Sequence, residues 1–280
     1  MDFAARKIEE AKVIHEVELM KLEKPFSALT PQAQAEVLRT RVYFHFACMQ
    51  MEACIEPALA ALAIYKKGKF VFVQENYQRM QLRLAEVYYL RSYFTEALSM
   101  FREAFKAEDT VPDRGYYNTK YIQLCLIQGE VEEAKHRFDS QVNNIASKQL
   151  YVIRDIISGL KVFLFTGELE KVYELLQLGF AAQAKTRYMQ YEIELRNLEV
   201  AYFLLSQNKD VALQLCERNV KYLHKNRFNV KKSRYPEFFL LTKAFIRKNK
   251  LTVRQQALLK DWQTEGYAFY GRLLKRMFGV

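Results

Sequence analysis

Apolar residues between positions 84 and 105 recur at helical spacing on both sides of a short break. The stretch reads LAEVYYLRSYFTEALSMFREAF, and its apolar positions are three, four or seven residues apart within each half. That spacing places side chains on one face of an α-helix. The pattern therefore predicts two amphipathic helices joined by a short turn at about Ser92. The apolar positions are Leu84, Ala85, Tyr88, Tyr93, Phe94, Ala97, Phe101 and Ala104.

A heptamer that occurs twice indicates where such turns recur. Residues 128–134 read QGEVEEA, and residues 166–172 read TGELEKV. A glycine at the end of a helix adopts the left-handed conformation without a Cβ penalty. The glutamates that follow would lie in the first turn of the next helix, where the helix dipole favours negative charge. The heptamer therefore predicts helix–turn–helix units whose first helices end at Gly129 and Gly167.

The second helix of each predicted unit carries a small residue four positions before a larger one. Ala97 precedes Phe101, and Ala134 precedes Phe138. The small residue lets two antiparallel helix backbones approach, while the larger side chain fills the space behind them. The corresponding pairs in the other units are Val172 with Leu176, Ala212 with Cys216, and Ala60 with Ile64.

This arrangement resembles the tetratricopeptide repeat. The units begin near Arg41, Gln78, Gly115, Ile153 and Ile193, so the resemblance covers about residues 41–225. The units are longer than the roughly 34 residues that are usual in the family, and the family's tryptophan is absent from them, because the sole tryptophan is Trp262. The chain is therefore similar to a divergent member.

The resemblance implies an all-α fold: a right-handed superhelix of antiparallel helix pairs, a TPR-like α-solenoid with about five pairs plus terminal capping helices. We expect residues 1–40 to form an N-terminal helical cap, residues 41–225 the repeats, and residues 226–280 a basic linker with C-terminal capping helices, all in one continuous solenoid. Another kind of helix-pair solenoid and an ordinary helical bundle are the alternatives.

Local signals add detail at the two ends. Residues 2–23 carry an apolar stripe that predicts one amphipathic helix. Thr30 is suited to cap the next helix, with Pro31 in its first turn, and Thr252 with Gln255 matches a capping box. The stretch KGKFVFVQENY at residues 67–77 alternates with period two and is interpreted as a connector.

The last segment predicts a helix with one apolar face. Such a helix either covers the last core layer of the solenoid, as solenoids require, or is exposed for docking. The apolar positions on that face are Tyr267, Tyr270, Leu274, Met277 and Phe278.

Composition supports a helical protein and offers no catalytic motif. The 280 residues include only nine glycines and five prolines, and few helix breakers favour helices. No P-loop, GxGxxG, HExxH or GxSxG motif is present, so we expect neither an enzyme nor a cofactor.

Cysteine usage and hydropathy point to a cytoplasmic location. The cysteines form no CxxC pair and do not cluster with the histidines, so they are expected to be reduced and buried and to bind no metal. No apolar run is long enough, at about 18 residues, to cross a membrane, and the N-terminus is charged throughout. The cysteines are Cys48, Cys54, Cys125 and Cys216.

The positive charge of the chain is local. The formal net charge is +11, and residues 221–260 contain twelve Lys or Arg against one acid, Glu237. Such a segment can attract nucleic acid or another polyanion, although a solvated helix face would have the same composition. The candidate polyanion-binding residues are Lys225, Arg227, Lys231, Lys232, Arg234, Arg247 and Lys248.

The resemblance also implies a binding surface. In tetratricopeptide repeats the first helices line the concave face, and carrying their groove positions onto this chain gives a set with several cations. A basic face with neighbouring tyrosines suits a peptide with acidic groups or a free carboxylate. The candidate peptide-binding residues are Arg79, Arg83, Glu86, Tyr89, Tyr116, Thr119, Lys120, Gln123, Arg154, Lys161 and Asn197, and Glu194 and Ala201 occupy further groove positions.

Three functions fit these observations. The first is a non-catalytic scaffold that binds a protein or peptide, possibly an acidic one, on its concave face. The second is nucleic-acid or polyanion binding through residues 221–260, where basic residues alternate with aromatic ones. The third is a peptide-sensing regulatory domain, which the resemblance to repeat proteins of bacterial transcriptional control suggests.

Overall fold

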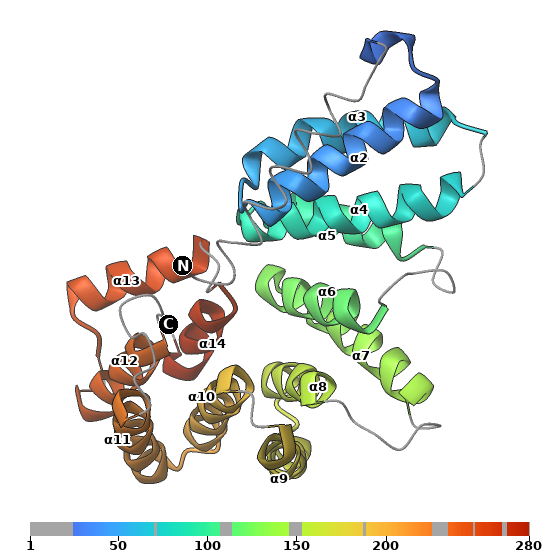
Figure 1. Cartoon of the computed structure of the whole chain (residues 1–280). Helices are drawn as coiled ribbons and strands as arrows, with labels where there is room; N and C mark the ends of the chain where they lie inside the picture. The colour runs from blue at the N-terminus through green and yellow to red at the C-terminus, as the bar shows by residue number, and fades with distance from the viewer. Residues whose placement is uncertain are drawn as a thin grey trace. The chain divides into compact units, whose positions relative to one another are not determined.

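The described part of the chain is entirely helical in a computed structural model (Figure 1). The description covers residues 25–69, 72–106, 114–145, 153–186, 189–225, 235–248, 250–264 and 268–279. Within these ranges no residue belongs to a strand. The chain divides into two compact units, Met1–Arg114 and Gly115–Val280, and the helix predicted over residues 2–23 lies outside the described residues.

The first unit, unit 1, contains two helix pairs. Helix α2 packs on α3, α3 packs on α4, and α4 packs on α5. The hydroxyl of Thr30 accepts a hydrogen bond from the Ala33 amide at 3.3 Å, which confirms the predicted cap. The elements are η1 (Phe26–Ala28), α2 (Pro31–Ala47), η2 (Glu52–Cys54), α3 (Ile55–Lys67), α4 (Val73–Leu90) and α5 (Phe94–Ala104).

The second unit, unit 2, continues the alternation of first and second helices. Helix α8 packs on α7, α9 and α10, and α10 packs in turn on α11, α12 and α14. The elements are α6 (Arg114–Gln128), α7 (Val131–Ile145), α8 (Ile153–Thr166), α9 (Leu169–Thr186), α10 (Met189–Leu205), α11 (Lys209–Lys225), α12 (Tyr235–Lys248), α13 (Val253–Thr264) and α14 (Ala268–Phe278).

The turn between the first and second helix of a pair has one geometry throughout. At each of five turns a residue has positive φ, and the amide of the next residue donates to the carbonyl five positions before it, as in a Schellman turn. At Gly167 φ is 83°, and the Glu168 amide donates to the Phe163 carbonyl at 3.1 Å. The positive-φ residues are Met49, Ser92, Gly129, Gly167 and Gln207.

The predicted small and large residues of the second helices are buried in four of the five units. Ala97, Ala134, Val172 and Ala212 are completely inaccessible. In α3 the register is one residue later than predicted, because Ala61 and Tyr65 are buried while Ala60 and Ile64 are only half-buried. Close helix contact is also visible at Gly159, where an added Cβ would lie 2.6 Å from the Phe138 ring.

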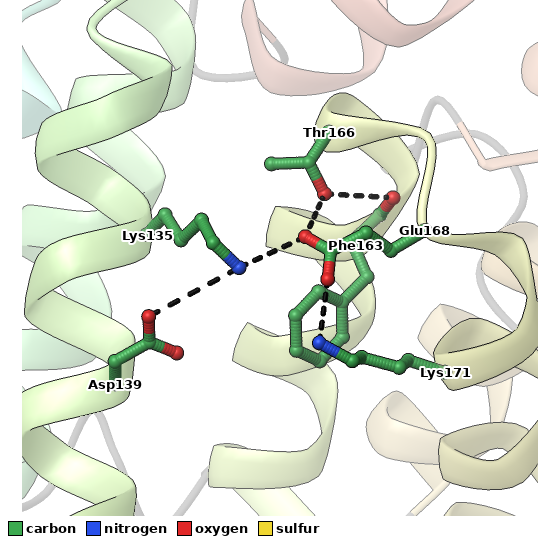
Figure 2. Close-up of polar contacts among 6 residues, drawn as sticks. All are labelled: Lys135, Asp139, Phe163, Thr166, Glu168 and Lys171. Atoms are coloured by element: carbon green, nitrogen blue, oxygen red, sulfur yellow. Dashed lines mark hydrogen bonds and ion pairs between the residues drawn. The ribbon is translucent and has the colours of Figure 1, made fainter.

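The glutamate of the repeated heptamer ties neighbouring helices together. One carboxylate oxygen of Glu168 accepts from Lys135 of α7 at 2.9 Å and from Thr166 at 2.8 Å, and the other accepts from Lys171 at 2.5 Å (Figure 2). Both lysine ammonium groups lie about 5 Å from the Phe163 ring centroid, at 5.3 and 5.0 Å. Hydrogen bonds from Lys171 and Lys135 lower the pKa of Glu168 to about 2.

The C-terminal helices belong to the core of unit 2. The Thr252 hydroxyl accepts from the Gln255 amide, and the Gln255 side chain accepts from the Thr252 amide, so the predicted capping box is present. Helix α14 is buried on most of its circumference, so it covers other helices and is not an exposed docking helix. Its buried residues are Ala268, Phe269, Tyr270, Gly271, Leu273, Leu274, Met277 and Phe278.

Three further findings bear on function. Among the described helices, none is both long and apolar enough to cross a membrane. None of the four cysteines, all of which lie in the described ranges, forms a disulfide, and three of them are buried, with Cys48 half-buried. Within the same described ranges, no group of three metal-ligating side chains comes together.

Candidate binding surface

The candidate residues of unit 2 lie on the first helices of three consecutive pairs. Tyr116, Thr119, Lys120 and Gln123 are on α6, Arg154 and Lys161 are on α8, and Asn197 is on α10. We call the surface that these residues and Glu194 define the first-helix face of unit 2.

Lys161 joins the three helices of this face. Its ammonium group donates to the Gln123 side-chain oxygen of α6 at 2.8 Å and pairs with Glu194 of α10 at 2.5 Å. The Lys161 side chain is only 5% exposed, and Glu194 is 20% exposed. Three groove positions assigned from separate repeats are therefore in contact, but the charge of Lys161 is already compensated inside the protein.

Helix α14 covers the part of the face around Lys161. The Phe269 ring lies 4.8 Å from the Lys161 ammonium group and 5.7 Å from the Phe165 ring of α8. The Arg276 guanidinium lies 5.9 Å from the Phe165 ring. The C-terminal half of α8 is therefore covered by α14, and an external ligand would have to use the N-terminal halves of α6 and α8.

Those N-terminal halves carry the accessible groups. Tyr116 is 39% exposed, and the Lys120 ammonium group lies 4.8 Å from its ring centroid. Arg154 is half-buried, and one of its terminal nitrogens lies 3.1 Å from the position that a Cβ on Gly115 would take. An aromatic ring and two cations thus lie on the first two turns of α6 and the first turn of α8.

Two other polar residues near this face are satisfied or protected. The Thr119 hydroxyl donates to the Gly115 carbonyl of its own helix at 2.9 Å. Asp155 is buried and accepts from Gln141 at 2.6 Å. Burial raises the pKa of Asp155, while Arg154 opposes that shift.

Asn197 differs from the other candidates because its side chain is completely buried. Neither its amide nitrogen nor its amide oxygen has a hydrogen-bond partner within the described structure. A buried amide without partners costs free energy, on the order of 1–3 kcal/mol for each unsatisfied group. Asn197 lies one turn after Glu194, which itself belongs to the face.

Of the candidates in unit 1, Arg83 joins α4 to α2, and the others make contacts within α4 or with α5. Arg83 lies between the rings of Tyr43 and Phe46, at 5.0 and 4.3 Å from their centroids, and pairs with the buried Glu86 at 2.8 Å. Arg79 is exposed and pairs with Glu75 at 2.6 Å. The half-buried Tyr89 contacts the Phe94 ring.

The candidate polyanion residues are described only in part. Arg227, Lys231, Lys232 and Arg234 lie outside the described residues, whereas Lys225, Arg247 and Lys248 are exposed on α11 and α12. Glu217 of α11 pairs with Lys243 and Arg247, both at 2.9 Å. The hydrogen bond from Lys243 lowers the pKa of Glu217. An acid outside the basic segment therefore neutralises part of its charge.

Sequence reasoning did not identify Phe269 as a neighbour of the face. The sequence did indicate that this helix is buried, because residues 268–278 are apolar on more than one side. That pattern is expected for a helix that lies between other helices and not on one surface.

Comparison with known proteins identifies the fold. No protein-family model matches the sequence, and no curated protein matches it. Among solved structures, the aspartyl phosphate phosphatase F from Bacillus subtilis is similar, with a TM-score of 0.54 and 15% identity over 90% of this chain and 69% of that chain. The chain therefore has an all-α, tetratricopeptide-like helical-repeat fold, as the sequence predicted.

Proposed function

We propose that this chain is a non-catalytic module that binds a protein or peptide on the first-helix face of unit 2. The contact of Gln123, Lys161 and Glu194 carries the proposal, because it holds groove positions of three consecutive repeats together. Helix α14 covers this contact, so the partner would bind beside it, on the N-terminal halves of α6 and α8. A continuous surface that crosses several first helices suits an extended or helical segment of another protein.

The chemistry of the accessible part favours a partner with acceptor groups. Lys120 and Arg154 are the cations of that part of the face, whereas Lys161 lies under α14 and pairs with Glu194. Arginine forms paired hydrogen bonds with carboxylates, and tyrosine offers apolar area with a polar tip. Acidic side chains or a terminal carboxylate are the groups that we expect the partner to present.

Affinity purification from cells that carry the gene tests this proposal. The wild-type chain is compared with a Lys120→Glu/Arg154→Glu double variant and with a Lys225→Glu/Lys248→Glu control that carries the same change of charge. Proteins recovered with the wild type and the control, but lost with the double variant, support the proposal. Equal recovery of every protein with all three chains contradicts it.

A catalytic role is the alternative that the similar solved structure raises, because its name describes an aspartyl phosphate phosphatase. An aspartyl phosphate is an acyl phosphate, so acetyl phosphate is a simple chemical stand-in. We expect the chain to leave the rate of acetyl phosphate hydrolysis unchanged. A rate that rises in proportion to protein concentration would refute the non-catalytic assignment.

Polyanion binding is a second candidate function. The observation that favours it is the exposure of Lys225, Lys248 and Lys221 on α11 and α12. Phosphate contacts make affinity fall steeply as salt rises. Binding of single-stranded DNA to the wild-type chain at low salt, and loss of that binding in the Lys225→Glu/Lys248→Glu variant, would support this candidate over the first.

A further inference from the structure

The outer face of α9 carries no charge between Gln177 and Ala184. Between Gln177 and Ala184 the sequence contains no ionisable residue, and the side chains exposed there are Gln177, Leu178, Ala181 and Ala184. The neighbouring second helices are different, because their exposed faces carry ionisable groups along their length. On α7 these are Glu132, His136 and Asp139, and on α11 they are Lys209, Asp210, Arg218, Lys221, His224 and Lys225.

Two large apolar side chains flank this uncharged strip. Leu178 is 49% exposed, and Tyr173 is 50% exposed with its ring 6.0 Å from that of Tyr202 of α10. Leu178 and Tyr173 lie on opposite sides of a line that runs through Gln177 and Ala181, because residues are 100° apart around a helix. Contiguous exposed apolar surface marks interaction sites in many proteins, and the uncharged strip between these two side chains is the candidate on α9.

We propose that this face of α9 binds the same face of a second copy of this chain, with the two α9 helices antiparallel. A two-fold axis that passes close to Leu178 and Gly179 brings together positions at about equal distances from it along the two helices. Leu178 then meets Leu178 of the second copy, and Tyr173 lies over Ala184 of the second copy. The two Leu178 side chains thus face each other at the centre of the interface, and each Tyr173 ring faces an alanine towards its ends.

The charges at the two ends of the strip fit the same arrangement. Glu174 and Lys185 are exposed and project on the same side of the strip as Leu178. Neither belongs to an ion pair within the described structure. The antiparallel arrangement places Glu174 beside Lys185 of the second copy, twice per dimer. A parallel two-fold arrangement would bring this side of one helix against the Tyr173 side of the other and leave both charges without an opposite charge, so the charges favour the antiparallel arrangement.

This self-complementarity identifies the occupant as a second copy. The pairs of matching size and of opposite charge are all centred close to Leu178 and Gly179, and pairing about one centre is what a two-fold symmetric interface requires. The inference does not depend on the proposed function, because α9 is a second helix and the proposed partner surface lies on first helices.

Sedimentation velocity of the whole chain over a wide concentration range tests the proposal. The wild type should shift from monomer to dimer as its concentration rises. Ala181→Glu should raise the dimer dissociation constant about tenfold or more, because it places two carboxylates near the two-fold axis. Gln214→Glu on α11, which adds the same charge at another exposed position, should leave that constant unchanged.

A reciprocal charge exchange separates direct contact from a general effect of charge. Glu174→Lys and Lys185→Glu should each weaken the dimer about tenfold, because each loses two attractions and creates two repulsions. The double variant should restore the wild-type dimer, and circular dichroism should show the same helix content for all variants. A wild type that stays monomeric at every concentration, a dimer unaffected by Ala181→Glu, or a double variant no better than the single ones would overturn the proposal.

Discussion

Replacing Lys161 by methionine tests whether the first helices of unit 2 are held together as the structure shows. Methionine keeps a long unbranched stem but removes the charge and the donors. The change leaves Glu194, which is 20% exposed, without its partner at 2.5 Å, and it leaves Gln123 without its donor at 2.8 Å. The attraction to the Phe269 ring at 4.8 Å is also lost.

The size of the effect follows from the burial of the two charges. Removing one member of a fully buried ion pair costs about 3–5 kcal/mol. Because Glu194 retains some contact with water, we expect Lys161→Met to lower the free energy of unfolding by about 2–3 kcal/mol. Glu194→Gln should cost about 3–4 kcal/mol, because the Lys161 ammonium that it leaves behind is more deeply buried.

Urea denaturation followed by circular dichroism measures these changes, and a double-mutant cycle isolates the pair. In the Lys161→Met/Glu194→Gln variant no buried charge is left unpaired, so its cost should be well below the sum of the single costs. We expect a coupling free energy of about 2 kcal/mol. A coupling free energy below about 0.5 kcal/mol, as for an exposed pair, would show that Lys161 does not bridge the repeats.

Three further changes test other parts of the structure. Gly167→Ala should destabilise the chain by about 1–2 kcal/mol through backbone strain alone, since no atom lies closer than 3.8 Å to the added Cβ. Gln207→Gly, at φ 62° in the equivalent turn, should stabilise the chain by about 1 kcal/mol in the same urea titration. A stabilising Gly167→Ala or a destabilising Gln207→Gly would disprove the equivalence of the two turns. Gly159→Ala should cost about 1–2 kcal/mol, because overpacking against Phe138 outweighs the gain in helix propensity, and an unchanged unfolding midpoint would contradict that packing. The pKa of Glu168 is lowered in the folded state, so the stabilisation that its carboxylate provides is present above pH about 4.5 and is lost as the pH falls towards about 2. Glu168→Gln should therefore reduce the change in the free energy of unfolding over that pH range, by less than about 1 kcal/mol because the group is partly exposed. An unaltered dependence of the free energy of unfolding on pH would refute the role of the carboxylate.

Local sequence signals were sufficient for the helix pairs. The glycines at 129 and 167 mark turns because the backbone there has positive φ, and Ser92 and Gln207 occupy the same conformation although they are not glycines. The turn at Met49 has the same geometry, but neither its residue type nor the spacing before it matches the repeated heptamer. That unit was accordingly the one whose second-helix register was displaced by one residue.

The candidate surface was predictable only in outline. Helical periodicity places Gln123, Lys161 and Glu194 on first helices, but it does not show that they contact one another, because that contact depends on the spacing between helices. The contact of Arg83 with two aromatic rings could not be predicted from the sequence either, because those rings belong to a helix about forty residues earlier. The cover that α14 provides depends on the packing of distant segments in the same way.

Site-specific photocrosslinking tests the binding assignment most directly. A photoreactive benzoylphenylalanine replaces Tyr116 on α6 in one chain and Gln214 on α11 in a matched control, and both are irradiated in cells that carry the gene. The account predicts a specific crosslinked partner from position 116 and none from position 214. A partner that crosslinks from position 214 and not from position 116 would contradict the claim that the first-helix face of unit 2 holds the partner.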